Sequence, residues 1–86
     1  MRTIHKQSLE LKEEQLITHP GQIDILHVAE QHDRIFIWYT CDPAAADQVT
    51  GIAIRGTGDQ ISTLNYHHIG TVLASSGAVW HVFKRL

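Results

Sequence analysis

The sequence is poor in several features that would assign the protein to a structural or functional class. Cys41 is the only cysteine among 86 residues, so no disulfide can form within one chain. This fits a reducing compartment. Seven Lys and Arg residues stand against nine Asp and Glu residues, which gives a formal charge of −2 with neutral histidines. A chain with this balance lacks the large positive field that general nucleic-acid binding requires.

Long apolar stretches are also absent from the chain. No run approaches the roughly 18 residues that a membrane-spanning helix needs, and the first six residues lack the apolar core of a secretory signal. We therefore expect a soluble cytoplasmic protein with no membrane partner. This length predicts a single domain over residues 1–86. A domain this small buries only about 60% of its unfolded surface, so we expect marginal stability.

Short apolar segments are what the chain does contain, and the clearest is Ile35–Cys41. All of its residues are β-branched, aromatic or cysteine, which favours a strand, and Asp42-Pro43 ends it. Strand periodicity separates two apolar sets onto opposite faces: Phe36, Trp38 and Thr40 on one, and Ile35, Ile37, Tyr39 and Cys41 on the other. Because both faces are apolar, we expect each to be covered, by a second layer, a helix or another subunit.

Alternating patterns bounded by turn residues predict further strands at residues 3–11 (with a bulge after Ile4), 15–18, 23–30, 49–55, 67–74 and 78–84. A helix over residues 8–17 is the alternative at the N-terminus. Period-2 alternation places Ile23, Ile25, His27 and Ala29 on one face. In the last strand it places Trp80 and Val82 together, opposite Val79, His81 and Phe83.

The connections complete the predicted architecture. Asp42–Gln48 combines an N-cap Asp, a Pro at the first helical position and three alanines, which predicts a short helical turn. Residues 60–66 show no period and predict an irregular crossing segment. The expected fold is therefore mainly β: a small antiparallel β-sandwich or barrel of about six or seven strands with one short helical turn.

Several short motifs occur in a familiar order: Arg2–Lys6, Ile25–Val28, Ile37-Trp38, Asp42-Pro43, Gly56–Gly58, His68–Val72 and Gly77–Phe83. Over essentially its full length the chain resembles a family of short proteins of unknown function encoded by bacteriophages and prophages. The resemblance implies a bacterial cytoplasm and assigns no catalytic residue. Family members often have histidine after Gly-Thr-Gly, where this chain has Asp59.

The candidate ligand-binding loop consists of Arg55, Gly56, Thr57 and Gly58. Glycines let backbone N–H groups converge on an anion, and an adjacent arginine can add a bidentate contact. The alternative is a turn that uses the positive φ of glycine. Since the loop matches neither a Walker motif nor a dinucleotide-binding motif, the turn is favoured.

The seven histidines suggest metal binding only weakly. His67 and His68 point to opposite faces of their strand, so they cannot easily share one ion. Either one could meet His81 across the final hairpin, but no zinc-binding spacing is present. We predict neither a metal nor another cofactor. We also predict no catalytic residue, because no two carboxylates are paired as acid and base.

The large aromatic residues suggest an interface, where Trp and Tyr are enriched, and the candidates are Phe36, Trp38, Trp80 and Val82. The leading hypothesis is a non-enzymatic, homo-oligomeric binding module that engages a host or phage protein and inhibits a host factor, such as a defence protein. An alternative is an oligomeric nucleotide-sequestering protein that holds phosphates with the Arg55–Gly58 loop and Lys84 or Arg85 of a neighbouring subunit. A weaker alternative is an enzyme or metal protein built on His67, His68 and His81.

Overall fold

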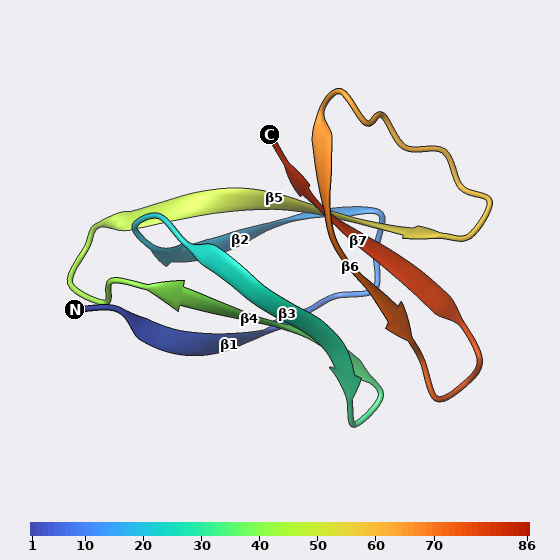
Figure 1. Ribbon diagram of the computed structural model, residues 1–86, viewed down its shortest axis with the longest axis horizontal. Helices are drawn as coiled ribbons and strands as arrows, with labels where there is room; N and C mark the ends of the chain where they lie inside the picture. Colours follow the sequence, from blue (N-terminus) through green and yellow to red (C-terminus); the bar gives the residue numbers. More distant parts are fainter.

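A computed structural model describes residues 1–86 as seven strands without a helix (Figure 1). The strands form two antiparallel sheets, one with the order β1-β4-β3 and one with the order β2-β5-β7-β6. The predicted antiparallel sandwich is confirmed, and the two sheets do not close into a barrel. The strands are β1 (Thr3–Leu9), β2 (Glu14–Pro20), β3 (Asp24–Gln31), β4 (Arg34–Cys41), β5 (Asp47–Gly56), β6 (Tyr66–Leu73) and β7 (Val79–Arg85).

The core lies between the two sheets and is built on β4. Its odd-numbered residues, which the sequence placed on one face, are all buried here, and Ile37 and Cys41 have no exposed surface. They form one cluster with inward residues of the other sheet: Ile17, Ile52, Ile54, Val72 and Val82. Only 15 of the 86 residues are buried, so the stability of the fold depends on few side chains.

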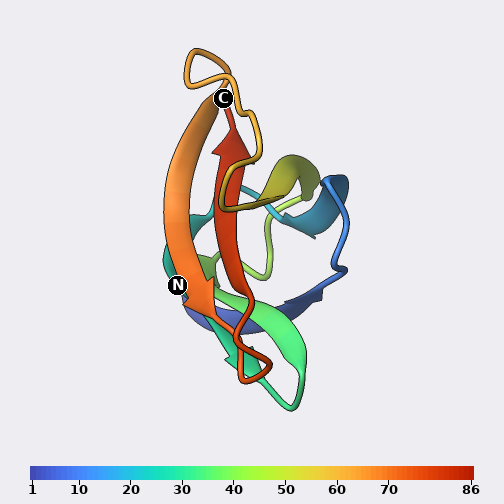
Figure 2. The same ribbon diagram turned by 90° about the vertical axis from the view of Figure 1, so that its right-hand side faces the viewer.

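The two sheets approach each other closely where β3 packs against β6. A side chain at position 70 would place its Cβ only 3.1 Å from the Cβ of Val28, so Gly70 permits this approach. Figure 2 shows β6 and β7 running side by side in the four-stranded sheet. The register of β6 shifts between His68 and Gly70, which turns Val72 into the core.

The bulges differ from the sequence-based prediction. β1 pairs with β4 from Thr3 to Leu9 without a shift, so no bulge follows Ile4, whose exposed side chain lies on the outer face. The bulge instead lies in β3, between Ile25 and His27. Grouping His27 with Ile25 was therefore wrong: Ile25 packs against the core, whereas His27 is exposed opposite Trp38.

The connections are turns. The side chain and the carbonyl of Asp42 accept hydrogen bonds from the backbone N–H groups of Ala44 and Ala45, both at 3.0 Å. The expected cap is present, but β5 begins at Asp47, so one turn forms rather than a helix. A segment this short forms too few hydrogen bonds to propagate a helix. The helix alternative for residues 8–17 is also wrong, because β1 and β2 occupy most of that range.

The position of the core predicts that alanine substitution at two isoleucines will change the free energy of unfolding by very different amounts. Ile37→Ala should lower the free energy of unfolding by about 2–5 kcal/mol, because it leaves a cavity at a fully buried site. Ile4→Ala, at a 63% exposed site, should change it by less than about 0.5 kcal/mol. Urea unfolding followed by tryptophan fluorescence measures both, and equal losses would contradict the assignment of the two faces.

Candidate functional site

The outer face of the three-stranded sheet carries aromatic side chains that no further layer of the chain covers. Phe36 and Trp38 are half-buried on β4, with their ring centroids 6.2 Å apart. Trp38 is paired with Lys6 of β1 on one side and with His27 of β3 on the other. The His27 ring centroid lies 5.9 Å from that of Trp38. We call Ile4, Lys6, His27, Phe36 and Trp38 the aromatic face.

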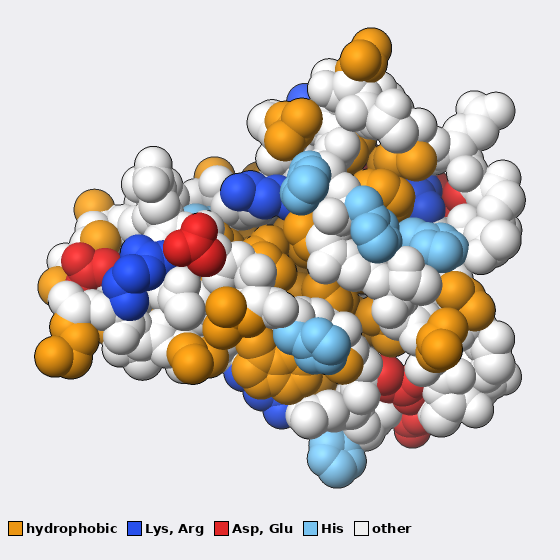
Figure 3. All heavy atoms as spheres, in the orientation of Figure 1, with side chains coloured by type: hydrophobic (Ala, Val, Ile, Leu, Met, Phe, Trp, Pro, Cys, Tyr) orange, Lys and Arg blue, Asp and Glu red, His pale blue; other side chains and the backbone are white.

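Lys6 extends across this face. Its Nζ lies 4.2 Å from the ring centroid of Phe36 and 5.6 Å from that of Trp38, and it donates a hydrogen bond to Gln31. A cation over an aromatic ring is attracted by the ring quadrupole. Figure 3 shows hydrophobic side chains gathered over this sheet, bordered by histidine and by Lys or Arg side chains. The surface is therefore apolar at its centre and cationic beside it.

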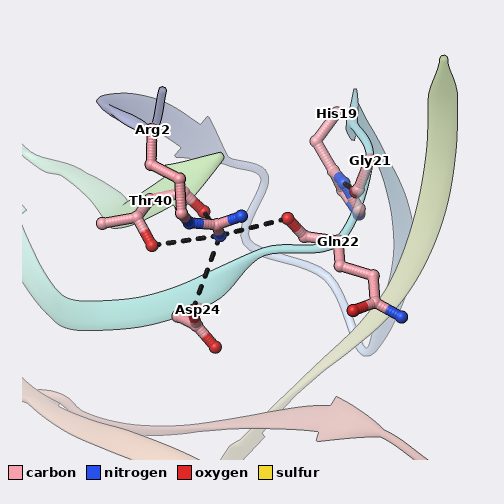
Figure 4. Close-up of polar contacts among 6 residues, drawn as sticks. All are labelled: Arg2, His19, Gly21, Gln22, Asp24 and Thr40. Atoms are coloured by element: carbon pink, nitrogen blue, oxygen red, sulfur yellow. Dashed lines mark hydrogen bonds and ion pairs between the residues drawn. The ribbon is translucent and has the colours of Figure 1, made fainter. Parts of the chain in front are cut away.

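Arg2 adds a second cation at one end of the same sheet (Figure 4). Its Nη2 donates to the carbonyls of Thr40 at 2.8 Å and Gln22 at 3.2 Å, and lies 3.5 Å from a carboxylate oxygen of Asp24. These contacts tie the N-terminus to β4 and to the β2–β3 connection. Because Arg2 and Asp24 are both partly exposed, the ion pair adds little stability.

His19 is a buried polar side chain with a structural role. Its Nδ1 lies 2.7 Å from the carbonyl oxygen of Gly21, and its Nε2 lies 2.6 Å from the hydroxyl of Thr50. A carbonyl only accepts hydrogen bonds, so Nδ1 carries the proton. In neutral His19, Nε2 then accepts from Thr50. Figure 4 shows His19 beside Gly21, to one side of the Arg2 contacts, where it joins β2 to the connection that follows it.

The other two predicted interface residues lie on the inner side of their sheet. Val82 has no exposed surface and belongs to the core cluster, so its predicted interface role is not supported. Trp80 is partly buried and packs against the same cluster. The two share a face of β7 as predicted, but this face points inward because it packs against the residues of the three-stranded sheet in the core cluster.

The Arg55–Gly58 segment forms a turn whose polar groups contact the chain itself. The Arg55 guanidinium donates to the carbonyls of Glu13 at 2.6 Å and Gln60 at 3.2 Å. The Asp59 carboxylate accepts from the Gly56 N–H at 2.7 Å, and Gly58 has a φ of 96°. A carboxylate at the position where a phosphate would bind repels a second anion, so this geometry does not favour phosphate binding.

Histidines gather over β6 and β7 (Figure 3). The Thr71 hydroxyl lies 3.0 Å from His68 Nε2 and 3.0 Å from His81 Nδ1, and His81 Nε2 lies 2.9 Å from the Thr57 hydroxyl. The predicted meeting of His68 with His81 is thus mediated by a threonine that the sequence analysis did not single out. No group of three metal-ligating side chains is assembled here or elsewhere in the chain.

Tyr66 and Glu14 connect the two edge strands of the four-stranded sheet. The Tyr66 hydroxyl donates to a carboxylate oxygen of Glu14, and this hydrogen bond raises the pKa of Tyr66 above its ordinary value of 10.0. Burial and the charge of Glu14 act in the same direction, whereas Arg85 and Arg55 oppose them. The pKa of Tyr39 is also raised, mainly by burial.

This contact predicts a measurable titration. Glu14→Gln should lower the pKa of Tyr66 towards its ordinary value, because the charge that favours the protonated phenol is removed. Absorbance at alkaline pH reports the change, and Tyr66→Phe isolates the signal of Tyr39, the only other tyrosine. Because the folded-state pKa is raised, the stabilisation is complete below about pH 10 and is lost as the pH rises through the folded-state pKa. An unchanged Tyr66 titration in the Gln variant would contradict the contact.

Comparison with known proteins identifies the chain at the level of a family. None of its secondary-structure elements is a helix long and apolar enough to cross a membrane. Searches of curated proteins and of solved structures found no match. One family model, described as a domain of unknown function (DUF7352), matches residues 1–86. The chain therefore belongs, over its full length, to the DUF7352 family of domains of unknown function.

Proposed function

We propose that this chain is a non-enzymatic binding module that engages another protein through its aromatic face. The observation that carries the proposal is the half-buried pair Phe36 and Trp38, which lie on the outer face of the middle strand of a sheet. Grouped apolar side chains at a surface mark interaction sites, and tryptophan is enriched among the residues that dominate binding energy. The rigid sheet holds both rings in place before a partner arrives, which reduces the entropy lost on binding.

The charges around the aromatic face favour a particular kind of partner. Lys6 lies directly over the rings, and Arg2 lies at one end of the sheet with Asp24 as the neighbouring carboxylate. A partner surface with an apolar centre and acidic side chains around it complements this arrangement. A second copy of the chain placed face to face here would bring cations of the same kind together. A different, acidic protein therefore fits the face better.

The biological setting we propose follows from the resemblance in motif order. The chain acts in a bacterial cytoplasm, as the product of a phage or prophage, and its partner is a host protein or another phage protein. We propose specifically that the chain covers a functional surface of a host defence protein and so inhibits that protein. This setting is an inference from resemblance, and the aromatic face supplies the physical contact through which it works.

The proposal predicts selective capture of one protein from bacterial lysate by the tagged chain, identified by mass spectrometry. Trp38→Ala should weaken that capture by about 2 kcal/mol or more, roughly a thirtyfold loss in affinity. Leu16→Ala is the matched control, because Leu16 is 73% exposed and lies on the other sheet. This variant should retain the partner. Thermal unfolding shows whether each variant stays folded. Retention of the partner by a folded Trp38→Ala variant would contradict the proposed face.

Self-association is a separate proposal, supported by the small core and by strand edges that remain unpaired. β3 and β6 are edge strands that pack against each other, whereas β1 and β2 are edge strands without such cover. Unpaired edges present backbone donors and acceptors to a second chain. We expect light scattering after size-exclusion chromatography to give at least twice the mass of one chain. A monomer mass at micromolar concentration would remove the oligomer from the proposal.

A further inference from the structure

A cavity of about 500 Å³ opens at the end of the molecule where three connections meet. Its walls come from the β1–β2 turn, the β3–β4 hairpin and the β6–β7 hairpin, which are far apart in the sequence. The volume lies within the range of about 300–1,000 Å³ that small-molecule sites occupy. Neither Phe36 nor Trp38 lines it, so it is distinct from the aromatic face.

The cavity has an apolar wall that continues the core. Leu9 and Ile35 belong to the buried cluster, and the partly buried Trp80 packs against that cluster while lining the cavity. The Trp80 ring provides a flat surface against which an alkyl chain can pack and which also attracts a cation. Trp80 lines this cavity because its face of β7 points inward.

The cavity is also lined by polar groups, among them an oriented carboxylate. The two oxygens of Glu30 accept hydrogen bonds from the backbone N–H and the hydroxyl of Ser75, at 2.6 and 2.8 Å. Asp33 approaches the same hydroxyl at 3.4 Å. These contacts join the β3–β4 hairpin to the β6–β7 hairpin and hold Glu30 in place. Each of its oxygens keeps a second lone pair for a further donor.

The charges that line the cavity define the ligand that it favours. The Glu10 carboxylate forms an ion pair with Lys12, whose ammonium group lies 2.9 Å away. The other charged residues that line the cavity are two carboxylates, Glu30 and Asp33, and one cation, Arg34. An anion would meet two carboxylates, and a neutral alkyl chain would use only the apolar wall. A cation on an apolar chain uses both sides, because it pairs with a carboxylate while its carbon atoms cover Trp80 and Leu9.

We propose that this cavity binds an organic cation, an ammonium or guanidinium group on a short apolar chain. A free alkylamine and the side chain of a lysine or arginine in another protein share this chemistry. The nitrogen lies between Glu30 and Asp33, and the chain lies along Trp80. The proposal does not depend on the partner proposed for the aromatic face, because it uses different residues at a different position.

The test uses the full chain labelled with ¹⁵N and titrated with n-butylammonium. The chain has two tryptophans, so the indole N–H of Trp80 reports on the cavity while that of Trp38 serves as an internal reference. We expect a saturable shift of the Trp80 signal, with a Kd on the order of 1–10 mM for so small a ligand. n-Butanol and n-butyrate, which have the same chain length, should bind at least about threefold more weakly.

Asp33→Asn is the sharpest variant. Asp33 has a φ of 63°, in the left-handed region that asparagine also tolerates, so the variant removes the charge and keeps the hairpin. It should weaken n-butylammonium binding by about two- to fivefold. Asp47→Asn is the matched control, because Asp47 is exposed at the start of β5 and does not line the cavity. The affinity of the Asp47→Asn variant for n-butylammonium should equal that of the unaltered chain.

The source of the cation is resolved by a second ligand, an acetylated and amidated Gly-Lys-Gly peptide. A shift of the Trp80 signal by both ligands supports a side chain of another protein, whereas a shift by n-butylammonium alone supports a free amine. The proposal is overturned if n-butanol binds as well as n-butylammonium or if Trp80 does not respond. Unchanged affinity in a folded Asp33→Asn variant would also overturn it.

Discussion

The fold depends on the packing of one strand that is apolar on both faces. β4 is hydrogen-bonded to β1 on one side and to β3 on the other, so its backbone is fully paired within the sheet. Its inward residues, of which Ile37 and Cys41 have no exposed surface, meet the four-stranded sheet and form the core. Its outward residues Phe36 and Trp38 have no such cover. Protein stability and the proposed binding surface therefore reside on opposite faces of the same strand.

The polar side chains are of two kinds: some bond only to the chain itself, and others remain available to a ligand. Every buried side-chain nitrogen and oxygen atom in the chain has a hydrogen-bond partner. The buried His19 ring and the partly exposed Arg55 guanidinium both have structural roles, because their partners are backbone carbonyls and a hydroxyl of the same chain. Lys6 differs from them, since its ammonium group lies exposed over two rings. Glu30 also differs, because it is held by Ser75 and still has accepting capacity on a cavity wall.

Both proposed sites result from the small size of the domain, but for different reasons. A sandwich with only 15 buried residues cannot cover both faces of each sheet, so one aromatic surface stays only half-buried. The sheets also leave a space at one end, and the connections around it supply polar groups over an apolar wall. The aromatic face suits a broad contact with a protein, whereas the cavity suits a single cationic group. Their separation lets each be altered without removing the other.

Local sequence determined the strands, since alternation and turn residues act within a few positions. It therefore predicted an antiparallel sandwich and the shared face of Phe36 and Trp38. It did not determine which face points inward, because that depends on the side on which the second sheet packs. Val82 consequently lies in the core, and His27 is turned outward by a bulge. The cavity was beyond sequence analysis because Glu30, Ser75 and Trp80 meet only when three distant connections are brought together by the packing of the sheets.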